Sequence, residues 1–143
     1  MSAFTEAELA YLQGTASTDL DAERRLARLA TIGPDGTPHV CPVGMWNLEG
    51  RDTQRETITI SGWDFANTKK FRDVARTGRA AIVVDDLADA EDSWRPRGIE
   101  VRGRAEAVEA PEAHIRLHPE RIVGWGLDHP GQRNARTVPT VHE

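Results

Sequence analysis

The chain of 143 residues contains one cysteine, Cys41, so no internal disulfide bond can form. A protein without disulfides suits a reducing compartment. Its first residues are polar and acidic, and they lack the positive and apolar segments of a signal peptide. No apolar run approaches the roughly 20 residues that span a bilayer. These absences together predict a cytoplasmic protein with no membrane partner.

Lysine is also scarce, because the 18 basic residues include only two lysines, Lys69 and Lys70. The formal net charge is −5 and the isoelectric point is about 5.5. A chain of this charge is not expected to bind nucleic acids or anionic membrane surfaces in general. An anionic ligand at a local basic site is still compatible with it.

Hydrophobic residues make up 38% of the sequence, which is a low share. We expect a single domain over residues 1–143, without internal repeats and with a thin core. Thin cores of small domains are often completed by a second subunit, so a partner copy of the chain is expected.

Several segments have the patterns of strands. Two apolar runs, residues 25–32 and 37–47, flank a Gly-Pro-Asp-Gly turn and predict a β-hairpin. Pro38 and Pro42 interrupt the second run, which favours an edge strand or a bulge where a ligand approaches. Further strands are predicted at 57–61, 79–84 and 98–108 and, in the tail, at 136–141.

Short helices are predicted between these strands. A capping box favours a helix over residues 5–13, Thr68 or Asn67 can cap a helix over 69–76, and Gly78 is a natural stop. Pro111 is expected to start a helix over 112–118. Together the elements predict a mainly β (α+β) fold, a small antiparallel barrel of about six strands with flanking short helices.

The two lysines fall at the start of the 69–76 helix. Free backbone N–H groups and cationic side chains there suit a bound phosphate. Lysine is electrostatically disfavoured at a helix N-terminus, which a bound anion would explain. A solvated helix face is the alternative interpretation. Trp63, which ends a strand just before this helix, could stack on a planar ring.

Other chemistry-bearing residues give weaker signals. His114 and His118 lie four apart on the predicted 112–118 helix, but no HExxH motif and no third ligand accompany them, so no metal site is predicted. Cys41 lacks a positive neighbour and is expected to be a buried, inert thiol. No hydrolase motif and no GxGxxG loop occur.

Four segments, residues 28–44, 68–86, 97–106 and 118–128, resemble in order the motifs of the pyridoxamine 5′-phosphate oxidase-like flavin and deazaflavin proteins. The last resembles a tail found in a subgroup assigned to coenzyme F420. The resemblance covers residues 6–138 and implies an FMN-binding split β-barrel. It also implies a homodimer with two cofactor sites at the subunit interface.

The resemblance further implies which residues hold the cofactor. Lys70, helped by Lys69 and Thr68, would bind its phosphate, although many relatives have a second Arg or Lys where this chain has Thr68. The remaining implied residues lie near the ring (Pro42, Val43, Gly44), beside the cofactor (Ser61, Gly62, Trp63), or across the interface (Arg97, Gly98, Trp125).

The implied activity is an oxidoreductase that uses F420 to transfer a hydride to a small conjugated or quinone-like acceptor. No catalytic side chain is named, because in such proteins the cofactor carries the redox chemistry. Two alternatives stay open: an FMN-dependent oxidoreductase of the same fold, and a non-catalytic protein that binds F420, flavin or haem.

Overall fold

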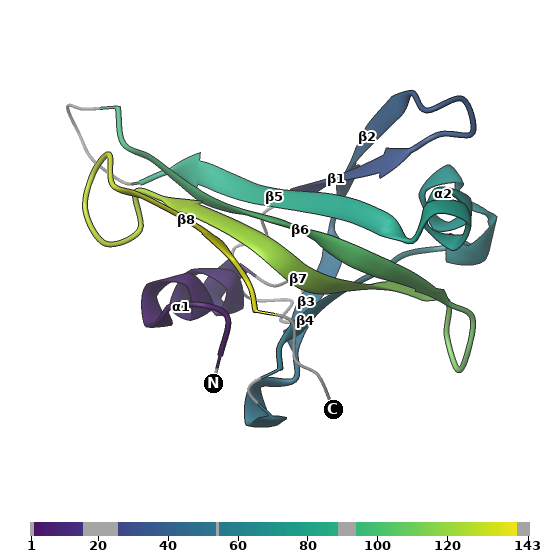
Figure 1. Ribbon diagram of the computed structural model, residues 1–143, viewed down its shortest axis with the longest axis horizontal. Helices are drawn as coiled ribbons and strands as arrows, with labels where there is room; N and C mark the ends of the chain where they lie inside the picture. The colour runs from purple at the N-terminus through teal and green to yellow at the C-terminus, as the bar shows by residue number, and fades with distance from the viewer. Residues whose placement is uncertain (1, 16–25, 54, 89–93, 140–143) are drawn as a thin grey trace.

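The computed structural model describes residues 2–15, 26–53, 55–88 and 94–139 (Figure 1). Its helices are α1 (Glu6–Thr15), α2 (Lys69–Thr77) and the short 3₁₀ turns η1 (Arg51–Thr53) and η2 (Phe65–Asn67). Its strands are β1 (Ala27–Ile32), β2 (Pro38–Val43), β3 (Met45–Glu49), β4 (Thr57–Ser61), β5 (Arg79–Leu87), β6 (Pro96–Val108), β7 (His114–Trp125) and β8 (Arg133–Thr137).

The strands form one antiparallel sheet in the order β2-β1-β5-β6-β7-β4-β3, and β8 pairs with β7. The two ends of this order, β2 and β3, are consecutive in the chain and only Gly44 lies between them. The sheet must therefore curl back on itself into a barrel (Figure 1). The predicted antiparallel barrel is confirmed, with eight strands in the described residues where about six were expected.

The barrel is split along one edge of β7. The first part of β7 pairs with β4, from Ile58↔Leu117 to Ile60↔Ile115. The last part pairs with β8, from Arg121↔Thr137 to Trp125↔Arg133. The register against β6 shifts between these two parts, because Arg102 faces Arg121 whereas Gly103 faces Pro119. This bulge bends β7, and its two halves pair with different strands.

The hairpin and the second helix form as predicted. Gly36, at φ +82°, completes the turn between β1 and β2. β2 lies at one end of the sheet order, which confirms the edge strand that its two prolines indicated. Thr68 caps α2 by accepting a hydrogen bond from the Phe71 N–H, and Gly78 ends the helix at φ +68°.

Other boundaries differ from the predictions. The helix expected over 112–118 is wrong, because residues 114–118 belong to β7 and residues 112–113 to the bend before it. Ile115 and Leu117 are buried while His114 and Arg116 are only partly covered, which is the two-residue period of a strand. The strand expected over 37–47 is divided into β2 and β3 at Gly44. The tail strand spans 133–137, and residues 140–141 of the prediction lie outside the described residues.

The core fills the barrel and extends under α1. Its fully buried large side chains come from most of the strands and include Trp46, Ile58, Ile60, Ile82, Ile99, Ile115, Leu117 and Ile122. Leu9 and Leu12 bring α1 into the same cluster. Figure 1 places α1 on the side of β7 and β8, and α2 at the other end of the sheet, near β1. Neither helix could span a membrane.

Candidate cofactor-binding site

The start of α2 offers free hydrogen-bond donors. The Thr68 hydroxyl donates to the carbonyl of Phe65 at 2.7 Å and accepts from the Phe71 N–H at 3.3 Å, so its bonding capacity is used by the cap. The backbone N–H groups of Lys69 and Lys70 have no acceptor within the described ranges. Two N–H groups at the positive end of a helix dipole suit an anion.

Lys70 lies beside these donors. Its ammonium is 5.3 Å from the centre of the Phe65 ring, a cation–π contact with a buried aromatic side chain. No carboxylate pairs with Lys70 in the part of the chain that the structure describes. The side chain is half-buried, and none of the described carboxylates compensates its charge.

Lys69 has a different environment. Its Nζ lies 3.0 and 3.2 Å from the two carboxylate oxygens of Asp73. Asp73 is 1% exposed and also accepts from the Arg76 guanidinium at 2.9 Å and from the Thr31 hydroxyl at 2.9 Å. Burial raises the pKa of Asp73, but the hydrogen bonds from Arg76, Lys69 and Thr31 outweigh it and lower the pKa to about 2. The carboxylate is therefore ionised and fully engaged.

Gly62, one of the residues predicted beside the cofactor, is linked to Lys70 through the Phe65 ring. Met45 pairs with Ser61, which sets Gly44 close to Gly62 just beyond this pair. A Cβ on Gly62 would lie 3.4 Å from the Phe65 ring that also contacts Lys70. Trp63 follows and is 92% exposed, so its ring is available to a ligand.

The three residues predicted near the ring are not equivalent. The Val43 side chain is buried in the core. Pro42 and Gly44 are exposed, so these two can present a surface to a ligand.

The structure does not bring Arg97, Gly98 and Trp125 to this site within one chain. Gly98 pairs with Asp85 on one side and Trp125 on the other. Asp85 lies six residues along β5 from Arg79, a separation of roughly 20 Å. The Lys69 ammonium is at the Arg79 end, because it lies beside Gly33, just after β1, and Ala30 of β1 pairs with Ala81. These three residues therefore form a second group at the far end of β5 and β6.

That second group is tightly packed. Arg97 donates to both carboxylate oxygens of Asp86, at 2.8 and 3.0 Å, and its guanidinium lies 5.1 Å from the centre of the Tyr11 ring. A Cβ on Gly98 would approach the Trp125 ring to 2.5 Å, so only glycine fits there. The indole of Trp125 lies directly against the β6 backbone.

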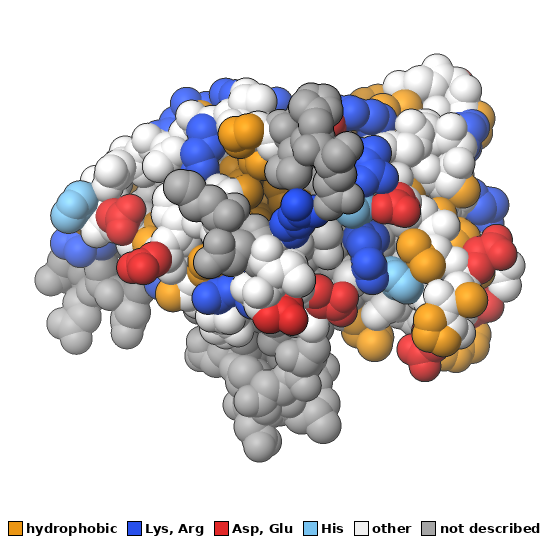
Figure 2. Space-filling view, turned by 60° about the horizontal axis from the view of Figure 1, so that its bottom comes forward, with side chains coloured by type: hydrophobic (Ala, Val, Ile, Leu, Met, Phe, Trp, Pro, Cys, Tyr) orange, Lys and Arg blue, Asp and Glu red, His pale blue; other side chains and the backbone are white. Residues whose placement is uncertain are grey.

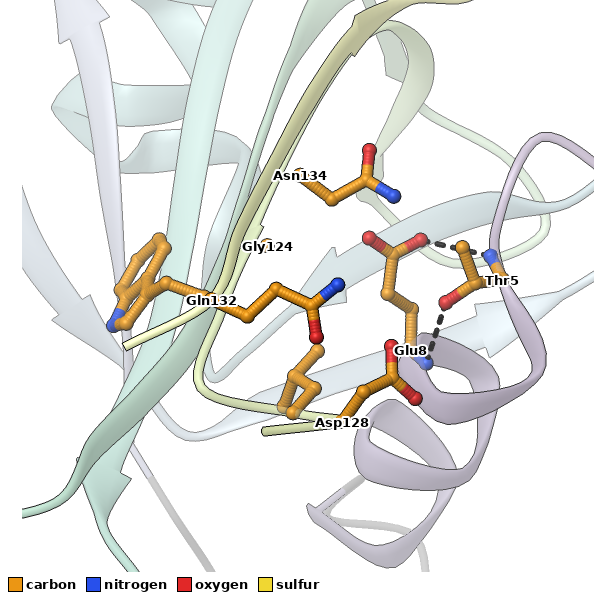
Figure 3. Close-up of a pocket in the computed structure, with 8 residues that line it drawn as sticks. Thr5, Glu8, Gly124, Asp128, Gln132 and Asn134 are labelled. Atoms are coloured by element: carbon orange, nitrogen blue, oxygen red, sulfur yellow. Dashed lines mark hydrogen bonds between the residues drawn. The ribbon is translucent and has the colours of Figure 1, made fainter. Parts of the chain in front are cut away.

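A small pocket opens between α1 and the last two strands (Figure 3). Its lining is mostly polar and consists of Thr5, Glu8, Gly124, Trp125, Leu127, Asp128, Gln132 and Asn134. The buried Glu8 carboxylate points into it but is already bound by the Thr5 N–H, at 2.8 Å, and by Arg136. The polar groups thus hold α1 in place, and we assign no ligand to this pocket.

The described surface shows no second cluster of side chains suited to binding a ligand or a metal. Lys and Arg side chains alternate with acidic and hydrophobic ones on the face shown in Figure 2. His118 pairs with Glu106 from β6, and hydrogen bonding to His118 lowers the pKa of that carboxyl. His114 and His118 lie on strand β7 and not on a helix. Within the described ranges, no three His, Cys, Asp or Glu side chains are grouped to hold a metal.

Sequence reasoning missed Asp73, Arg76 and Thr31 around Lys69. The signal for two of them is in the sequence, because Lys69, Asp73 and Arg76 have the i,i+4 and i,i+3 spacings of helical ion pairs. Thr31 lies on β1, 42 residues away from Asp73 in the chain, and carries no local signal.

Known proteins share both the sequence pattern and the architecture of this chain. The sequence pattern of the family described as pyridoxamine 5′-phosphate oxidase matches residues 16–141. A relative from Streptomyces rimosus, a 5a,11a-dehydrotetracycline/5a,11a-dehydrooxytetracycline reductase, is 35% identical over 134 residues, covering 87% of this chain and 84% of the relative.

Solved structures share the fold at low sequence identity. A haem-binding protein from Mycobacterium smegmatis is 18% identical with a TM-score of 0.63, covering 96% of this chain and 60% of its own. An F420 reductase is 20% identical with a TM-score of 0.53, covering 78% and 93%. These likenesses confirm the split β-barrel. The chain belongs to the pyridoxamine 5′-phosphate oxidase-like family.

Proposed function

We propose that this protein is an oxidoreductase that uses F420 to reduce a small conjugated or quinone-like acceptor. The observation that carries the redox assignment is the 35% identity, over most of both chains, to a reductase of dehydrotetracyclines. That relative acts on polycyclic conjugated molecules, which is the acceptor class that we expect for this chain.

The chemistry of the donor set fits an anionic cofactor. Lys70 carries an uncompensated charge beside two free backbone N–H groups, and the three together can hold a phosphate. The exposed Trp63 ring and the exposed backbone at Gly44 supply flat surfaces for a planar ring system. When bound, reduced F420 supplies a hydride, and a proton from a nearby donor or solvent completes the reduction.

We infer that two copies of the chain form each site. Arg97 and Trp125 lie at the end of β5 and β6 that is remote from the start of α2, so a partner copy is the simplest way to bring them to a cofactor held at Lys70. Exposed apolar side chains near Gly44, Val40 at 66% and Met45 at 55%, give a second copy a surface to cover. Sedimentation equilibrium is expected to give a dimer; a monomer at micromolar concentration would contradict the shared site.

The test of the cofactor is a pair of fluorescence titrations, one with F420 and one with FMN. We expect F420 to bind more tightly, and FMN preference would favour the flavin-dependent alternative. The Lys70→Met variant should weaken binding at least about tenfold, because it removes a charge-assisted hydrogen bond. Arg51→Met, which removes an exposed charge from η1, is the matched control.

Turnover separates an enzyme from a carrier. Reduced F420 is mixed with the protein and a quinone or dehydrotetracycline, and the recovery of F420 absorbance is followed. Acceptor-dependent oxidation that requires the protein supports a reductase. Tight binding of F420, flavin or haem without turnover of any acceptor would instead support the non-catalytic alternative.

A further inference from the structure

The two lysines at the start of α2 are neighbours in sequence but face different groups. Consecutive residues of a helix point about 100° apart. Lys70 lies over the Phe65 ring, whereas the Lys69 ammonium lies against Asp73. A Cβ on Gly33 would come within 3.2 Å of the Lys69 Nζ, so this ammonium also covers the turn between β1 and β2. Figure 1 shows this turn beside α2.

Asp73 is fixed where it is. Its side chain is 2% exposed and receives hydrogen bonds from two elements, Arg76 of α2 and Thr31 of β1. A carboxylate held in this way cannot follow Lys69 if the lysine turns toward solvent. Movement of Lys69 would instead remove one of the two cations that compensate a buried charge, which is unfavourable.

We propose that Asp73 withholds Lys69 from the anion site, so that Lys70 alone among the described side chains binds the cofactor phosphate. This inference rests on the function proposed above. It makes Asp73 a positioning residue, because it acts through Lys69 and thereby sets the positive charge that the site presents. It also differs from the role that the family resemblance implied for Lys69, which was to help Lys70 bind the phosphate.

The experiment measures F420 affinity by fluorescence titration for four variants. Lys69→Met should change the dissociation constant less than twofold, whereas Lys70→Met should raise it at least about tenfold. Asp73→Asn frees Lys69 and should lower the dissociation constant roughly threefold, which is within the range that one exposed ion pair contributes. Asp73→Asn/Lys69→Met should return it to the wild-type value, because the gain requires the freed lysine.

The alternatives give different patterns. If Asp73 only stabilises the fold, Asp73→Asn weakens binding, and the second change at Lys69 does not alter that result. If Lys69→Met weakens binding as much as Lys70→Met, Lys69 contacts the phosphate and the inference is overturned. If Asp73→Asn does not fold, Asp73→Glu, which keeps the charge on a longer side chain, replaces it, and the two lysine variants still decide whether Lys69 contacts the phosphate. If wild-type protein binds neither F420 nor FMN, the proposed function fails first, and the inference fails with it.

Discussion

Glu8 in the first helix and Arg136 in the last strand form an ion pair across 128 positions of the chain. Glu8 is 2% exposed, and one Nη of Arg136 lies 3.0 Å from its carboxylate. The guanidinium also donates to the carbonyl of Ala3, at 2.6 and 3.2 Å. The pair therefore attaches α1 to the part of the sheet where β8 pairs with β7.

We expect Arg136→Met to lower the free energy of unfolding by about 2 kcal/mol, because it leaves the buried Glu8 carboxylate without its cation. The loss should be smaller than for a fully buried pair, since the Arg136 side chain is 26% exposed. Urea unfolding measures it. Arg133→Met, an exposed arginine on the same strand, is the control and should change stability little. Equal stability of the two variants would contradict a structural role for the pair.

Asp73 should make the protein sensitive to acid. Its pKa is lowered from the usual 3.8 to about 2, because hydrogen bonds from Arg76, Lys69 and Thr31 outweigh the effect of burial. A carboxyl whose pKa is lowered by folding stabilises the folded state at pH values above its pKa in the unfolded chain. This stabilisation is lost as the pH falls from about 4 to about 2.

Unfolding curves measured from pH 7 to pH 2 test this expectation. Asp73→Asn should be less stable than wild type at pH 7, and the difference should shrink below pH 4. The control is Asp52→Asn, which removes an exposed carboxyl of η1. A difference between wild type and Asp73→Asn that stays constant over this range would show that the carboxylate charge does not matter.

Gly98 should not accept a side chain. An added Cβ would lie 2.5 Å from the Trp125 ring and 2.7 Å from both the Asp85 Cβ and the carbonyl of Val84. We expect Gly98→Ala to cost about 2 kcal/mol of stability through this overpacking, as seen in thermal melts. Gly14→Ala in α1 is the control, since no atom lies within 4 Å of its added Cβ. A melt of Gly98→Ala that matches wild type would contradict the close packing of β5 and Trp125 around this residue.

Trp63 should affect binding without affecting stability. Its side chain is 92% exposed, so Trp63→Ala should change the free energy of unfolding by less than about 0.5 kcal/mol. If the ring stacks on the cofactor, the same change should weaken F420 binding about tenfold. Trp94 is 79% exposed just before β6, and Trp94→Ala is the control. Equal affinities of the two variants would remove Trp63 from the site.

Local signals in the sequence predicted the elements around the candidate site well. The Gly-Pro-Asp-Gly turn, the Thr68 cap and the Gly78 stop each depend on the conformational preference of one or two residues, and all three form. The failure at 112–118 has a physical reason. Pro111 favoured a helix start, but the alternation of buried Ile115 and Leu117 with polar neighbours fits pairing with β4 and β6.

The candidate site was predicted only in part, because tertiary contacts decide which side chains are free. The position of Lys70 followed from the helix start. The engagement of Lys69 by Asp73 depends also on Thr31 from β1, which no local pattern indicates. The separation of Arg97 from Lys70 follows from the length and direction of β5 and β6, which periodicity alone does not provide.

The closure of the barrel at Gly44 has a consequence for how the chain folds. The hairpins β1–β2, β3–β4 and β6–β7 each join neighbours in sequence and can form by local contacts. Closure needs β1 to pair with β5 and β4 to pair with β7, over some 50 or more residues in each case. Such loops carry a larger entropic cost. We therefore expect the hairpins to form first and to pair with one another later, so that the chain reverses direction at Gly44 only when the barrel closes.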